Sequence, residues 1–156
     1  MRTVVLAGTC AVGLVAAVAA WAQAPAAPDA AAVKACLDRQ EGKLGHACIG
    51  TVADPCIAAA EGDTAKSKAC AQRELRMWQA ELEMALRGVR KGGFKEINDA
   101  VTQSQTGWTS SQRALCPIFG KIDPGMLPGG AEYCAMVETA NRALLLRRLA
   151  EAVNEH

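Results

Sequence analysis

Cysteine content is the feature that most constrains this chain. Its 156 residues include seven cysteines, Cys10 near the N-terminus and six more from Cys36 to Cys134. In a short chain that reaches an oxidising compartment, an even set of cysteines is typical of a disulfide framework. Six cysteines permit many pairings, but short loops favour neighbours in the sequence. We therefore expect three local disulfides, Cys36 with Cys48, Cys56 with Cys70, and Cys116 with Cys134.

The first 22 residues predict a signal peptide for export. Arg2 supplies the initial positive charge, residues 4–20 are almost wholly apolar, and Ala20-Trp21-Ala22 is a small-x-small cleavage site. Cleavage would discard Cys10, which lacks the longer apolar run that a lipid-attachment cysteine needs, and would leave Gln23 as the first residue. An uncleaved membrane anchor is the rival reading, but the apolar run is short for a membrane span. We expect a periplasmic or secreted protein with no stable membrane insertion after cleavage.

The rest of the chain predicts one all-α domain over residues 31–156. No segment alternates apolar and polar residues with the period of two that a strand needs. Residues 23–30 are rich in Pro and Ala, and we expect a flexible lead-in there, with Asp29 capping the helix that follows. The predicted fold is a small disulfide-stapled helical bundle of three longer helices plus a short helical N-terminal region.

Caps and helix breakers predict the boundaries. A long helix is expected from Thr64, its cap, to a stop at Gly92-Gly93. Residues 117–130 contain three prolines and four glycines, so we expect a loop there and a new helix from about residue 131. Before the long helix, a short helix should pass through Val33, Cys36 and Leu37 and end near Gly42 or Gly45, and a loop with one short helical piece should follow over residues 50–63.

Each of the three longer helices has one apolar face, because its large apolar residues recur at intervals of three and four. Trp78 and Trp108 belong to these faces, so we interpret both as core residues rather than binding anchors. Gly107, next to Trp108, should allow a neighbouring helix to approach closely. The three faces are Leu75, Trp78, Leu82, Leu86 (or Ala85) and Val89; Phe94, Ile97, Val101, Ser104 or Gln105, Trp108 and Leu115; and Tyr133, Val137, Ala140, Leu144, Leu145 and Leu149.

The charge balance argues against nucleic-acid binding. Basic and acidic side chains number 17 and 16, and removal of Arg2 leaves 16 of each. The positive charge gathers in a basic cluster (Arg87, Arg90, Lys91 and Lys95) and a basic end (Arg142, Arg147 and Arg148). We interpret both as solvated helix faces. The alternative is that the basic cluster binds anionic polymers of the cell envelope.

The residues indicate neither catalysis nor metal binding. The chain has two histidines, His46 and His156, and no nucleophile with a plausible base beside it in the sequence. Glu96 and Asp99 can share one side of a helix, but this is common on solvated helices. A metal site formed by Cys36, His46, Cys48 and Cys56 would compete with the expected disulfides. We predict a binding protein without a cofactor.

Four spaced elements carry a family resemblance: "CLDRQEGKLGHACIG" with the later Cys56, "CAQRELRMWQAEL", "QTGWTSSQRALC" and "CAMVETANRALLL". Together they resemble the lysozyme inhibitor LprI-like family of small exported bacterial proteins, from Cys36 to about Leu146. Gln79, Glu83, Leu86 and Gln112-Arg113 depart from the family pattern and suggest a rearranged polar network between helices. Besides the cysteines, the matching motif residues are Glu74, Trp78, Leu82, Gln105, Trp108, Thr139 and Arg142.

The resemblance implies a protein partner, with inhibition of a c-type lysozyme as the named hypothesis. Such enzymes cleave with a carboxyl pair in a cleft, so a cation on a rigid loop would suit an inhibitor. The disulfide-closed loop after Cys116 is the candidate, and Lys121 is its first candidate residue. The alternatives are a structural or envelope-stress protein that inhibits no lysozyme, or a carrier of a small ligand. The candidate partner-binding residues of the loop are Phe119, Lys121, Asp123 and Met126, beside the apolar Ile118 and Leu127.

Two groups of candidate binding residues can instead have structural roles within the protein. The apolar residues of the loop can instead close the bottom of the core. Thr139 and Arg142 can form a partner-binding pair, but their position one turn apart near a disulfide favours contacts within the protein.

Overall fold

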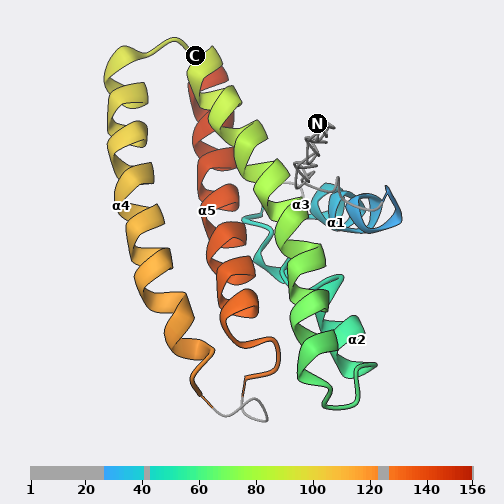
Figure 1. The fold of residues 1–156 in the computed structure, drawn as a ribbon. Helices are drawn as coiled ribbons and strands as arrows, with labels where there is room; N and C mark the ends of the chain where they lie inside the picture. Colours follow the sequence, from blue (N-terminus) through green and yellow to red (C-terminus); the bar gives the residue numbers. More distant parts are fainter. Residues whose placement is uncertain (1–26, 41–42, 123–126, 156) are drawn as a thin grey trace, which may run out of the picture.

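The structure, a computed structural model, describes residues 27–40, 43–122 and 127–155. These ranges contain no strand, and the predicted all-α fold is confirmed. Figure 1 shows α5 between α3 and α4, with α1 and α2 beside α3. The predicted signal peptide, with Cys10, lies outside the described residues. The elements are α1 (Ala27–Arg39), the 3₁₀ helix η1 (His46–Cys48), α2 (Ala53–Ala58), α3 (Thr64–Lys91), α4 (Lys95–Phe119) and α5 (Gly130–Asn154).

The start of α1 corrects the expected lead-in. Residues 27–30 are already helical, so this part of the stretch 23–30 is not the flexible segment predicted. Asp29 lies inside the first turn of α1 rather than at its cap. Its carboxylate receives Arg73 from α3, with Nη2 2.8 Å from Oδ1 and Nε 3.1 Å from Oδ2. This two-point ion pair fixes α1 against α3.

Two other boundaries differ slightly from the prediction. The cap of α3 is Asp63 rather than Thr64, because the Asp63 carboxylate accepts the backbone N–H of Lys66 at 3.0 Å. This hydrogen bond lowers the pKa of Asp63. At the other end of the bundle, α4 continues past Pro117 to Phe119, so the loop begins later than expected. Pro117 lies in the last turn of α4. Its missing backbone N–H removes one helical hydrogen bond there, and the helix ends two residues later.

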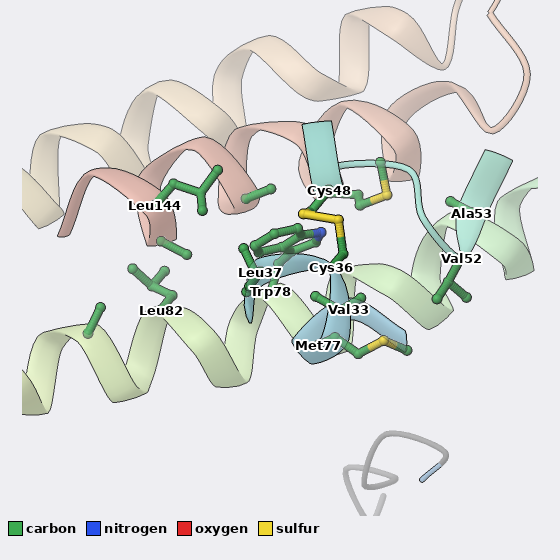
Figure 2. Packing of buried hydrophobic residues seen from close by; sticks show 14 of the residues in the cluster. Val33, Cys36, Leu37, Cys48, Val52, Ala53, Met77, Trp78, Leu82 and Leu144 are labelled. Carbon is green, nitrogen blue, oxygen red and sulfur yellow. A yellow bond between two sulfur atoms is a disulfide. The ribbon is translucent and has the colours of Figure 1, made fainter. Parts of the chain in front are cut away.

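The core lies between α3 and α5 and is closed by α1 and η1. Trp78 is fully buried, and Figure 2 shows it amid Leu37 and the Cys36–Cys48 disulfide. On α5, Met136, Ala140, Ala143, Leu144 and Leu146 are all buried. Burial on several sides is expected for a helix with neighbours on both flanks.

The face predicted for α4 is only partly buried. Val101 and Trp108, near the middle of the helix, pack against the core as expected. Phe94 and Leu115, near its ends, are 43% and 44% exposed, which corrects their placement. Leu145 of α5, also predicted to be buried, is 59% exposed because it lines an open groove between α4 and α5.

Close helix approach occurs between α3 and α5 and not at Gly107. A Cβ on Gly88 would lie 2.8 Å from the Cβ of Ala150, and one on Gly92 would lie 2.7 Å from Cγ2 of Val153. A Cβ on Gly107 would meet no heavy atom within 4 Å, so the expected close neighbour of that glycine is absent from the described residues. Gly88 of α3 and Gly92, its C-cap, therefore set the distance to α5.

The disulfides are the three local pairs that loop length favours: Cys36–Cys48, Cys56–Cys70 and Cys116–Cys134. They join α1 to η1, α2 to α3, and α4 to α5, respectively. Since three of the four residues proposed for a metal site are oxidised in these bonds, that alternative is lost. None of the helices in the described ranges is long and apolar enough to span a membrane.

Candidate functional site

A buried carboxylate organises the N-terminal half of the domain. Glu74, on α3, is fully buried and accepts four hydrogen bonds. Its Oε1 receives the backbone N–H of Gly50 at 2.7 Å and the indole N–H of Trp78 at 2.8 Å. Its Oε2 receives the backbone N–H groups of Val52 and Ala53 at 2.8 and 2.7 Å. A carboxylate is tolerated in the core here because these donors replace its lost water.

The segment that binds Glu74 has a backbone suited to this contact. Gly50 has a φ of +91°, a backbone conformation that residues with a side chain rarely adopt. The carboxylate of Asp54 occupies the space where a Cβ of residue 50 would lie. Val52 is the N-cap of α2 and Ala53 its first residue, where free backbone N–H groups point toward an acceptor. The Cys56–Cys70 disulfide then ties α2 to α3 one turn before Glu74. Glu74 and this disulfide together fix the position of α2.

Polar contacts also join α4 to α5. The Gln112 side chain donates to Oγ1 of Thr139 at 3.0 Å and to the carbonyl oxygen of Ala135 at 3.2 Å. Nε of Arg142 donates to Oε1 of Gln105 at 2.9 Å, and burial lowers the pKa of Arg142. Thr139 and Arg142 therefore make contacts within the protein. Gln112, a predicted departure from the family pattern, takes part in these contacts.

The basic residues are largely paired along their own helices. Arg87 lies 3.8 Å from Glu83, and Lys95 binds Asp99, so Asp99 is engaged in a surface ion pair. In the basic end, Arg147 and Arg148 both contact Glu151 at 3.3 Å. Such exposed pairs contribute little stability, but they divide the basic cluster into residues with an ion-pair partner and residues without one. Arg90 is of the second kind among the described residues.

The end of the bundle that contains the Cys116–Cys134 disulfide carries an apolar groove of about 580 Å³. Ile57 of α2, Phe119 of α4 and Val137 of α5 supply apolar walls, together with Leu127. Asp54 and Glu138 are the acidic residues of its lining, which includes no basic residue within the described part of the chain. A concave apolar surface with a few polar groups at its rim is suited to bind part of a partner.

Tyr133 fixes one rim of this groove. Its hydroxyl donates to Oδ1 of Asp54 at 2.9 Å and so connects α5 to α2. Burial raises the pKa of Tyr133 to about 12, and the hydrogen bond and the negative charge of Asp54 add to the effect. The phenol therefore keeps its proton, and with it the hydrogen bond to Asp54, to higher pH than an ordinary tyrosine would.

The predicted loop residues lie close to the groove. Phe119 and Leu127 line it, so these apolar residues face a groove rather than fill the core. Lys121 is exposed beyond the end of α4, and Ile118 is 51% exposed. Asp123 and Met126 lie outside the described residues. The groove thus brings α2 and the disulfide-closed loop together, an arrangement that joins residues far apart in the sequence.

A comparison with protein-family models identifies the chain. The model described as "Lysozyme inhibitor LprI" matches residues 56–148, more than half of the 156 residues. The chain belongs to the LprI lysozyme inhibitor family. No curated protein and no solved structure matches it. The description of the LprI family is that of an inhibitor and not of an enzyme.

The LprI match covers both disulfides that flank the groove, Cys56–Cys70 and Cys116–Cys134, and all of α3 and α4. Family membership and the disulfides together indicate an exported protein. The matched region also includes Glu74 and Trp78, which lie one turn apart on α3 and are joined by a hydrogen bond.

The sequence did not predict all of the groove residues. Asp54, Ile57 and Glu138 were not among the candidate binding residues, because no local pattern shows that α2 lies beside α5. The spacing of Cys56 and Cys70 was the one available signal, since their bond brings α2 to the start of α3. The partner of Tyr133 across 79 positions of sequence had no signal at all.

Proposed function

We propose that this chain is an exported LprI-family protein that binds and inhibits a c-type lysozyme, in the periplasm or outside the cell, through the end of the bundle that holds the apolar groove. The observation that carries the proposal is the family match over residues 56–148. The predicted signal peptide and the three disulfides agree with the location.

The proposed contact has two parts. Lys121, exposed beside the groove, presents a cation to the carboxyl pair of the enzyme cleft. The groove itself receives an apolar side chain from the wall of the cleft, while Asp54 and Glu138 face the cationic surface that c-type lysozymes carry. The Cys116–Cys134 bond restrains both ends of the loop before binding, which reduces the entropy lost in the complex.

The test is the residual activity of a c-type lysozyme on bacterial cell walls, titrated with the oxidised chain from Gln23 to His156. The unchanged protein should inhibit in a dose-dependent manner. Lys121→Ala should raise the concentration needed for half inhibition by about tenfold, since it removes one charged contact. Ala58→Arg places a bulky cation on an exposed groove position and should have an effect of similar size.

Lys91→Ala is the matched control. Lys91 is exposed at the end of α3, and Figure 1 shows this end of the bundle opposite the loop that joins α4 to α5. This variant should inhibit as well as the unchanged protein. Absence of inhibition at micromolar protein would refute the proposed function, and equal losses in all three variants would refute the proposed surface.

A further inference from the structure

A second groove lies between α3 and α4, away from the disulfide-closed loop. Its volume is about 410 Å³, within the range of about 300–1,000 Å³ typical of small-ligand sites. The groove exists because α4 packs mainly on α5, while α3 and α4 contact each other little. The α4 side of the groove carries hydroxyl and amide groups that are too short to fill the space.

The charge of this groove has one sign. Arg90 from α3 and Arg113 from α4 both line it, and no acidic side chain does so within the described ranges. Neither arginine forms an ion pair with a described residue, in contrast to Arg87, which lies near Glu83. Each guanidinium group can bind a carboxylate or another anion, because it donates several hydrogen bonds in a fixed plane.

Two hydroxyls of the groove are oriented as acceptors. The hydroxyls of Thr102 and Thr106 donate to carbonyl oxygens of their own helix at 2.8 and 3.2 Å, which leaves oxygen lone pairs for other donors. Oδ1 of Asn98 is buried and has no hydrogen-bond partner among the described residues. Because this oxygen is closed to solvent, it can accept from a ligand hydroxyl only when the Asn98 side chain turns toward the groove.

We propose that this groove binds a carboxylated saccharide. A sugar acid supplies carboxylates for Arg90 and Arg113 and several hydroxyls for the acceptors of α4. Leu86, on the α3 side, offers an apolar patch that a C–H face of a sugar ring can cover. An acidic peptide would also meet the arginines, but it would bring fewer hydroxyl donors. This inference concerns a separate surface and does not depend on the proposed inhibition of lysozyme.

The experiment uses three probes of similar length: trigalacturonate, which is a carboxylated saccharide; maltotriose, a neutral saccharide; and triglutamate, an acidic peptide. Binding to the oxidised mature chain is followed by backbone amide shifts in two-dimensional NMR at low ionic strength. Trigalacturonate should shift residues of the groove and should bind at least about tenfold more tightly than either other probe. Equal binding of triglutamate would overturn the choice of a saccharide, and equal binding of maltotriose would overturn the role of the arginines.

Three variants locate the site. Arg90→Gln and Arg113→Gln should each weaken trigalacturonate binding by about tenfold, because each removes a charged donor. Arg87→Gln is the control, since it removes the same charge from the same helix at a residue outside the groove lining. Thermal unfolding of each variant confirms that these exposed substitutions preserve the fold. An equal loss of trigalacturonate affinity in Arg87→Gln would mean that the anion is attracted diffusely by the basic surface and would overturn the proposed groove. The same conclusion would follow if trigalacturonate shifted no backbone amide of α4.

Discussion

Trp78 donates its indole N–H to the carboxylate of Glu74 at 2.8 Å, and both side chains are completely buried on α3. The same carboxylate accepts three backbone N–H groups from residues 50–53. Glu74 therefore holds the start of α2 and the central tryptophan at once. In a domain whose N-terminal third has few bulky apolar residues, this polar contact supplements the core.

Replacement of Glu74 by glutamine should destabilise the protein although it conserves shape. The amide presents one oxygen and one NH₂ to donors that need two acceptor oxygens, so at least one buried donor loses its partner. We expect Glu74→Gln to lower the free energy of unfolding by about 3 kcal/mol, measured by chemical denaturation. Glu83→Gln, on the exposed side of α3 near Arg87, is the control and should change it by less than about 0.5 kcal/mol. A similar value for both variants would contradict the role of Glu74.

Two Gly→Ala substitutions should change stability in opposite directions. Gly107→Ala adds a methyl group where no atom lies within 4 Å, so the better helix propensity of alanine should raise the free energy of unfolding by about 0.5–1 kcal/mol. Gly88→Ala places a Cβ 2.8 Å from that of Ala150 and should lower it by about 1–3 kcal/mol. Thermal or chemical unfolding of both variants is sufficient, and a stabilised Gly88→Ala protein would show that α3 and α5 can separate without cost.

The single tyrosine permits a direct test of the groove rim. Because the native pKa of Tyr133 is raised to about 12 from 10.0, the folded state holds the phenol proton more tightly than the unfolded state. The resulting stability is present in full below pH 10 and is lost as the pH rises from about 10 to about 12. Ultraviolet absorbance of the tyrosinate should show that the native protein ionises at higher pH than the chain in denaturant.

Asp54→Asn separates the causes of this shift. The variant loses the charge beside the phenol, so its ionisation midpoint should fall below that of the unchanged protein. The midpoint should remain above that of the denatured chain, because burial is the larger cause. A midpoint unchanged by Asp54→Asn would mean that the hydrogen bond between the two residues is not formed in solution.

Removal of the Cys116–Cys134 bond should separate stability from binding. With a sequence separation of 18 between its cysteines, this bond stabilises the fold by about 3 kcal/mol in the chain-entropy model. The double variant Cys116→Ala, Cys134→Ala should unfold at lower denaturant concentration but keep its helical circular dichroism. If the proposed inhibitory surface is correct, its inhibition of lysozyme should fall more than that of a variant destabilised elsewhere, such as Gly88→Ala, when both are assayed where they are fully folded.

Helices and disulfides were accessible from the sequence because both depend on local spacing. Gly92, Thr64 and the apolar periodicity placed α3 to within a residue, and loop lengths selected all three disulfides. The exposed ends of α4 were not accessible in this way. Phe94 has the same spacing as Val101, and only the three-dimensional arrangement of α4 on α5 decides that one is exposed and the other packed.

The polar contacts between distant segments were the least predictable. Asp29 has the residue type and the position expected of a helix cap, yet its carboxylate instead binds Arg73, 44 positions away. Glu74 was recognised as a motif residue, but its four donors come mostly from a loop whose path no sequence pattern describes. Gly88 carried no signal at all, because a glycine within a helix looks the same whether or not another helix crosses it.

The order of the disulfides has a consequence for how the protein matures. Along the chain from Cys36 to Cys134, the first cysteine pairs with the second, the third with the fourth, and the fifth with the sixth. A chain that crosses a membrane from its N-terminus exposes these cysteines to the oxidant in the same order. Each bond can therefore close before the next pair emerges, and an oxidant that joins successive thiols produces the native set without later exchange.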